Sequence, residues 1–332
     1  MPHALSIASP SATTASSPAQ AALPVAACEG AAAAVAAVLD RPDEALDYLE
    51  AKLAFDALVD PSLDGHRARE EVARLAEEGR RIAGAAPGEA GLLAALRTLI
   101  YRPGPWNGHR PFAYDHENFQ SIRLKLIANY LRTRRGNCVS MPVLFLILAE
   151  KLGLDMTLAT SPCHLYLRHR DASGRVVNLE ATSGAEPARD VWIRQNFPIS
   201  DRAVESGLYM RSLSRREGVA LMAETVVHQL KSERRWEEAA AVCEAMLRHS
   251  PRDAFALANL GASCLNILRA EFVDKYRSVF LIPLPLRPRY ALLQQKKDAA
   301  FTTAERLGWT PVQLLRAGLE GEAQMQQVER IL

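Results

Sequence analysis

Residues 135–153 read RGNCVSMPVLFLILAEKLG, and this stretch decides the fold. Gly136-Asn137 is a turn signal, and the apolar run that follows it is too long for a typical strand. Gly153 at its end suits a helix C-terminus, and Pro142 falls within the first turn, where a missing N–H costs little. The stretch therefore predicts an apolar helix at the centre of a core, with Cys138 at or just before its first residue.

Three short strand-like segments follow this helix, at residues 155–160, 164–170 and 176–182. A three-residue loop, Ala172-Ser173-Gly174, between the last two would place Gly174 in the left-handed conformation that this hairpin type needs. The pairing then sets Tyr166 opposite Glu180 and makes His164 a diagonal neighbour of Glu180 on the same face. A four-residue loop would shift the register by one and send His164 and Glu180 to opposite faces.

Cys138, His164 and Glu180 together suggest nucleophilic thiol chemistry. A thiol becomes a nucleophile when it ionises, which the partial positive charge of a helix N-terminus favours. It also needs an adjacent base, for which His164 is the candidate, and the imidazole needs an acceptor that orients it, for which Glu180 is the candidate. Each residue has a structural alternative: a small buried residue that starts a core helix, a strand histidine bonded to a carbonyl, and a solvated carboxylate paired with Arg168.

Weaker candidates surround these three residues. Asn178 shares a face with Glu180 and is a weaker substitute for the orienting role. Asn118 or Gln120 can donate a hydrogen bond to an oxyanion, although helix capping explains them as well. Cys163 has no C-x-x-C partner, and no second histidine cluster completes a zinc site, so we expect no metal and no cofactor. A disulfide between Cys138 and Cys163 remains open as an oxidative off-switch, ranked below simple packing.

The regions before and after these motifs differ in composition and in the spacing of their apolar residues. Residues 1–42 are rich in Ala, Ser, Thr and Pro, which predicts a disordered tail, and residues 43–134 carry mostly helical spacing. Residues 213–332 read as helix to the end. Their spacing resembles the tetratricopeptide repeat, with its period of about 34 residues, but the match extends over one and a half repeats at best.

Composition limits the class of protein. A length of 332 residues suggests about two domains, and a net charge of +2 gives no basic field for nucleic acid. The longest dense apolar run, residues 141–149, is far shorter than the roughly 20 residues that cross a membrane. Five cysteines are too few for a disulfide scaffold, so we expect a cytoplasmic protein with reduced thiols. Residues 25–28, ending at Cys28, resemble a lipoprotein cleavage box, but Pro18 and Pro24 interrupt the apolar stretch that should precede it.

Four separated motifs make the sequence recognisable. They are Arg135-Gly136-Asn137-Cys138, Leu152-Gly153-Leu154, Ser161-Pro162-Cys163-His164 and Asn178-Leu179-Glu180-Ala181-Thr182. Over residues 43–212 the chain resembles the bacterial transglutaminase-like family, and within it the SirB-type branch, which often carries tetratricopeptide repeats. The resemblance implies a papain-like thiol fold with the triad Cys138, His164 and Glu180. Two departures are a cysteine at position 163, where members usually have glycine, and glutamate rather than aspartate at position 180.

We therefore expect an α+β protein in three parts after the tail: a helical N-terminal subdomain (43–134), a papain/transglutaminase-like core with a small antiparallel sheet (135–212), and a C-terminal helical-repeat module (213–332). The expected function is a thiol enzyme that acts on an amide or acyl group, as an amidase or protease in preference to a crosslinking transferase. The alternative is a non-catalytic scaffold whose helical repeats bind a peptide or protein, because many SirB-type members lack the cysteine or the histidine.

Overall fold

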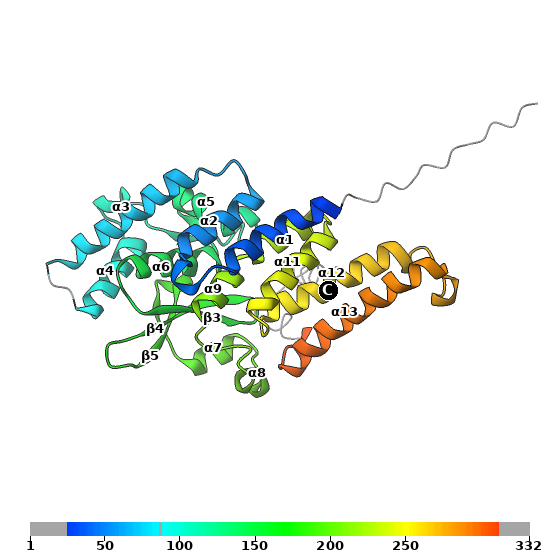
Figure 1. Cartoon of the computed structure of the whole chain (residues 1–332). Coiled ribbons are helices and arrows are strands. Elements are labelled where there is room, and N and C mark those ends of the chain that lie inside the picture. The colour runs from blue at the N-terminus through cyan, green and yellow to red at the C-terminus, as the bar shows by residue number, and fades with distance from the viewer. Residues whose placement is uncertain (1–24, 86–87, 312–332) are drawn as a thin grey trace, which may run out of the picture.

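The structure, a computed structural model, describes residues 25–85 and 88–311 (Figure 1). Its fold is α+β, as the sequence predicts, with many helices around small sheets. The helices are α1 (Val25–Leu39), α2 (Tyr48–Val59), α3 (Gly65–Ala83), α4 (Glu89–Tyr101), α5 (Ile127–Thr133), α6 (Ser140–Lys151), α7 (Asp190–Asn196), α8 (Asp201–Glu205), α9 (Arg215–Met222), α10 (Glu224–Ser232), α11 (Trp236–His249), α12 (Ala254–Leu268) and α13 (Arg287–Arg306). The strands are β1 (Ala113–Tyr114), β2 (Arg135–Gly136), β3 (Met156–Ser161), β4 (His164–Arg170), β5 (Val176–Glu180) and β6 (Glu186–Ala188).

The main sheet is antiparallel, with strand order β3-β4-β5-β6, and β1 pairs with β2 in a separate parallel ribbon. Side chains of β4 alternate between two apolar clusters, because successive residues of a strand point to opposite faces. Leu167 joins the cluster that contains α6, and Tyr166 joins the one that contains Ile193 of α7. Both faces of the sheet are therefore covered, and the sheet gives a fixed base to the residues at its ends.

The β4–β5 hairpin has the predicted register. Leu167 pairs with Leu179, and Arg170 pairs with Val176. The next pair joins Asp171 to Arg175 through a 2.9 Å backbone hydrogen bond, which leaves a three-residue loop. Gly174 in this loop has a φ of +84°, the left-handed conformation that the loop type requires. The register therefore puts His164 and Glu180 on the same face of the hairpin.

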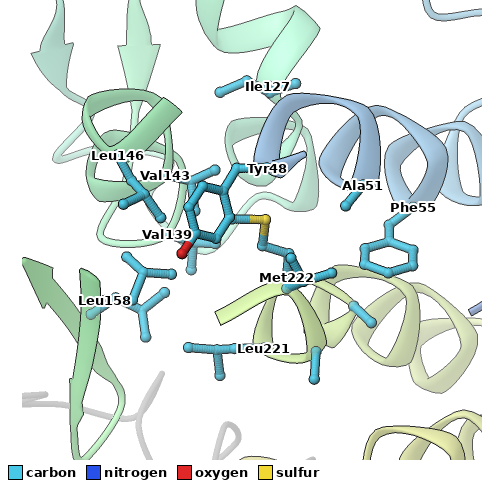
Figure 2. Close-up of a cluster of buried hydrophobic side chains, with 14 of the residues drawn as sticks. Tyr48, Ala51, Phe55, Ile127, Val139, Val143, Leu146, Leu158, Leu221 and Met222 are labelled. Carbon is cyan, nitrogen blue, oxygen red and sulfur yellow. The ribbon is translucent and has the colours of Figure 1, made fainter. Parts of the chain in front are cut away.

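One apolar core joins elements that are far apart in the sequence. Figure 2 shows Tyr48 of α2, Val139 just before α6, Leu158 of β3 and Met222 of α9 pointing toward one another. All four side chains are buried. The backbone next to Cys138 is therefore held by packing from α2 and α9. The division of the chain at residues 134 and 212 remains a prediction, and this cluster extends across both boundaries.

The tail predicted over residues 1–42 is wrong for its last part, which forms α1. Val35 and Leu39 are fully buried, and α1 packs against α11, as Figure 1 shows. The run is rich in alanine, which has the highest helix propensity, and the partner that stabilises it lies about 200 residues further along the chain. Residues 1–24 of the predicted tail lie outside the described residues, as does the side chain of Cys28.

The helices predicted at the C-terminal end are present as α10, α11 and α12, each packed against the next, while their assignment to a tetratricopeptide repeat stays a prediction. Residues 312–332 of the predicted module lie outside the described residues. Among the described helices, none is both long enough and apolar enough to cross a membrane.

Candidate active site

Cys138 lies two residues before α6, held by its neighbour Asn137. The side-chain oxygen of Asn137 accepts hydrogen bonds from the backbone N–H of Val139 at 3.0 Å and of Ser140 at 3.3 Å, which is how asparagine caps a helix start. Its amide nitrogen donates to the carbonyl of Phe119 at 2.9 Å. Asn137 is buried, so these bonds fix the position of the thiol against the loop before α5.

Gly136 is required for the close packing of this turn. A Cβ atom at this position would lie 2.5 Å from Oγ of Ser140 and 2.6 Å from the ring of Tyr130, both shorter than real Cβ contacts. The turn therefore accommodates only glycine without movement of its neighbours, which explains in physical terms why glycine precedes Asn137-Cys138.

The hairpin brings His164 and Glu180 into contact. Nε2 of His164 lies 2.7 Å from Oε2 of Glu180, and the two side chains are 11% and 7% exposed. The other oxygen of Glu180 accepts hydrogen bonds from the backbone N–H and the hydroxyl of Thr182, at 2.9 and 2.6 Å. The ring of Phe197 stacks on the imidazole with centroids 4.7 Å apart. The imidazole is therefore held by a carboxylate at one edge and an aromatic ring on one face.

The interaction of His164 with Cys138 and Glu180 affects its protonation. Burial disfavours the charged imidazole, but the hydrogen bonds to Cys138 and Glu180 outweigh burial and raise the pKa of His164 to about 10. Burial acts in the opposite direction on Glu180, and there the hydrogen bonds from His164 and Thr182 prevail and lower the pKa of the carboxyl. Since Nε2 is engaged by Glu180, Nδ1 is the ring nitrogen available to the thiol.

A cavity of about 670 Å³ opens beside Cys138 and His164. Cys163 is exposed within it and has a φ of +57°. Because Ser161 pairs with His164, Pro162 and Cys163 form a two-residue turn, and proline followed by a left-handed residue is typical of a type II turn. The backbone thus has the conformation that glycine favours, with a cysteine in place. Sγ of Cys138 is 3.9 Å from the carbonyl oxygen of Cys163, and both thiols are free.

The three weaker candidates lie apart from the thiol and imidazole contacts. Asn118 is exposed, and its backbone and side chain bond to Asp115. Gln120 is exposed and lines the cavity. Asn178 donates to Asp190 at 2.6 Å and to the carbonyl of Ala188, so its amide is engaged away from His164, and it is Glu180 that contacts the ring.

Two neighbours of the site were not identified from the sequence. Asn137 had a usable signal, since asparagine before an apolar helix is a common cap. Phe197 had none, because only the fold brings it from the segment after α7 onto His164.

The fold and the site together indicate a class of protein. Residues 66–196, which contain Cys138, His164 and Glu180, match the family model described as the transglutaminase-like superfamily. At the level of single proteins, the chain is 26% identical over 135 residues to Protein SirB1 of Salmonella typhimurium, covering 40% of this chain and 49% of that one. It is also 27% identical over 147 residues to a UPF0162 protein of Buchnera aphidicola, covering 42% and 53%. The chain spans about half the length of these curated relatives, and no solved structure matches it.

Proposed function

We propose that the chain is a thiol-dependent enzyme that acts on an amide or acyl group, with Cys138 as nucleophile, His164 as acid and base, and Glu180 as the group that orients His164. The observation that carries the proposal is the 2.7 Å contact between His164 and Glu180 beside a thiol at the start of α6. A nucleophile, a base and an orienting carboxylate in this order are what acyl transfer by a thiol requires.

In the proposed reaction, the Cys138 sulfur attacks the carbonyl carbon, and Nδ1 of His164 gives a proton to the leaving amine. The C–N bond breaks and a thioester remains. A water molecule then loses a proton to Nδ1 and attacks the thioester, so that the acid is released and the thiol is restored. A tetrahedral oxyanion needs a fixed donor. The N–H groups of Val139 and Ser140 already bond to Asn137, so we assign this role to the N–H of Cys138.

Hydrolysis, as by an amidase or protease, is favoured over crosslinking because it needs only water as acceptor. The reduced thiols that this chemistry requires are maintained in the cytoplasm, where we expect the protein to act. The test is a screen of amide and ester substrates with wild type and Cys138→Ala. Turnover that is lost in Cys138→Ala and reduced about 10²-fold or more in His164→Ala supports the proposal. Turnover that persists in Cys138→Ala contradicts it.

A second candidate function is that of a partner-binding module at the connection from α12 to α13. Phe280 is 87% exposed, and Leu284 is 73% exposed. A contiguous patch of exposed apolar side chains is typical of an interaction site. A partner that co-purifies equally with wild type and Cys138→Ala, but is lost with Phe280→Ser, would favour this function. Equal recovery with Phe280→Ser would exclude this surface.

A further inference from the structure

The cavity beside Cys138 extends to the C-terminal helices, where its lining is charged. The Lys and Arg side chains of the lining are Lys125, Arg211, Lys231 and Arg252, and the acidic ones are Glu217, Glu224 and Asp253. These residues come from the segment before α5, from the segment before α9, and from α9, α10 and the start of α12. The thiol and this charged wall therefore face one common space.

The carboxylates of the wall are already engaged. Glu217 forms an ion pair with Arg211 at 2.5 Å, and Glu224 pairs with Lys125 at 3.1 Å. Asp253 accepts the backbone N–H of Ala256 at the start of α12, and burial raises the pKa of its carboxyl to about 6.

The cations of the wall are not fully matched. Lys231 is only 8% exposed, and its Nζ bonds to the side-chain oxygen of Asn259, with no ion pair to any carboxylate of the described chain. An ammonium group has three donors, so this bond leaves donors for a ligand. Arg252 donates to the carbonyl of Ser206 at 3.1 Å and likewise pairs with no described carboxylate. The unmatched charge of the cavity is therefore positive.

A buried cation without an anion is costly to maintain. Burial first, and then the neighbouring cation Lys125, lower the pKa of Lys231 to about 8. His228, which contacts Lys125, has a pKa held well below its usual value, by burial first and then by the two lysines, so it adds no charge at neutral pH. An anion in the cavity would offset the charge on Lys231.

We propose that this cavity binds a substrate with a carboxylate group, which Lys231 holds while the bond to be cleaved lies at Cys138. A volume of about 670 Å³ is in the range of pockets that hold small ligands or a short peptide end. The proposal rests on the proposed function for the position of the reacting bond. The carboxylate site itself does not depend on catalysis and is tested separately.

The first test measures binding to the full chain by thermal shift and calorimetry, with glutarate, its neutral analogue glutaramide, and inorganic phosphate at equal ionic strength. We expect glutarate to bind about 10-fold or more tightly than glutaramide, because a hydrogen bond to a charged group is worth this factor. Lys231→Met should remove the preference. Lys296→Met on α13, whose lysine pairs with Glu244 outside the cavity, should keep it.

Three outcomes overturn the inference. They are equal or undetectable binding of glutarate and glutaramide, a preference that persists in Lys231→Met, and a preference for phosphate over glutarate, which would assign the site to a different anion. The comparison of glutarate with glutaramide needs only the wild-type chain, so it decides the matter even where Lys231→Met does not fold.

The second test asks whether a ligand whose carboxylate is held by Lys231 also reaches the thiol of Cys138. 6-(Iodoacetamido)hexanoate and its neutral methylamide alkylate a cysteine by the same step: sulfur forms a bond to the CH2 carbon, the C–I bond breaks, and iodide leaves. We expect the acid to label Cys138 about 10-fold faster than the methylamide in wild type, and at an equal rate in Lys231→Met. Equal rates in wild type contradict this inference. Failure of both reagents to label Cys138 counts instead against the proposed function.

Discussion

Replacement of Glu180 by glutamine tests whether the carboxylate holds His164 in its protonated form. The two side chains are in contact at 2.7 Å and are almost fully buried, and glutamine keeps the size of the side chain but removes its charge. A hydrogen bond to a charged group contributes about 1.5–3 kcal/mol, and about 1.4 kcal/mol corresponds to one pKa unit. We therefore expect the pKa of His164 to fall by about 1 to 2 from its value of about 10.

The assay is an NMR titration of the histidine rings in the full chain, with the His164 signal assigned from His164→Gln. Glu77→Gln is the matched control, because the Glu77 side chain is 78% exposed on α3 and pairs with Arg80 at the surface. A pKa of His164 that is equal in wild type and Glu180→Gln would refute the reasoning, as would a wild-type pKa at or below 6.5.

The same substitution should lower the free energy of unfolding by an amount that depends on pH. Because the pKa of His164 is raised on folding, its protonation stabilises the fold fully below about pH 6.5, and this contribution is lost as the pH rises through about 10. The pKa of Glu180 is lowered, so its contribution is present above about pH 4.5 and is lost as the pH falls through the folded-state value. The difference in the free energy of unfolding between wild type and Glu180→Gln should therefore be largest between about pH 5 and 6.5 and shrink toward pH 10. Urea denaturation at both ends of this range measures it, and a constant difference would count against the linkage.

Substitutions at three further positions test the packing around the site and in the core, each by denaturation of the full chain. Gly136→Ala brings a Cβ atom to 2.5 Å from Oγ of Ser140 and should lower the free energy of unfolding by about 1–3 kcal/mol; an unchanged midpoint would show that the turn can widen. Cys163→Gly should change stability by less than about 1 kcal/mol, whereas Cys163→Val should cost about 1–3 kcal/mol, since a β-branched residue is strained at a φ of +57°; equal midpoints would argue against strain at this turn. Lys52→Met leaves the fully buried Asp56 without its cation and should cost about 3–5 kcal/mol, and a loss below about 1 kcal/mol would mean that the pair is dispensable.

The hairpin and the thiol helix can be predicted from sequence because their signals are local. Gly174 fixes the loop length, the loop length fixes the register, and the register fixes which face His164 and Glu180 share. The contact between the two side chains follows from a few residues of adjacent chain. Their roles in a reaction stay a prediction.

The charged wall of the cavity could not be predicted in this way. Lys125 lies before α5, whereas Glu224 and Lys231 lie on α10, and each alone has the sequence pattern of an ordinary polar residue on a helix surface. Only the tertiary packing of α10 against the segment before α5 brings them together, which buries Glu224 and Lys231 and leaves the Lys125 side chain 12% exposed. For the same reason the sequence predicts a tail where α1 forms: its alanine-rich sequence carries a single charged residue, Glu29, which does not mark one face, and α11 supplies the surface on which it packs.

Tyr48, Val139 and Met222 share one core (Figure 2). Because of this core, the part of the chain that can fold is larger than the part that sequence comparison recognises. The family model matches residues 66–196, yet Tyr48 lies before that range and Met222 lies after it. A fragment cut to the matched range would expose the apolar face on which α2 and α9 rest, and we expect it to aggregate. Heat should unfold the thiol turn and the helices after residue 213 in one cooperative transition. The shortest segment that can fold and be passed on as a domain is therefore longer than the range that the family model matches.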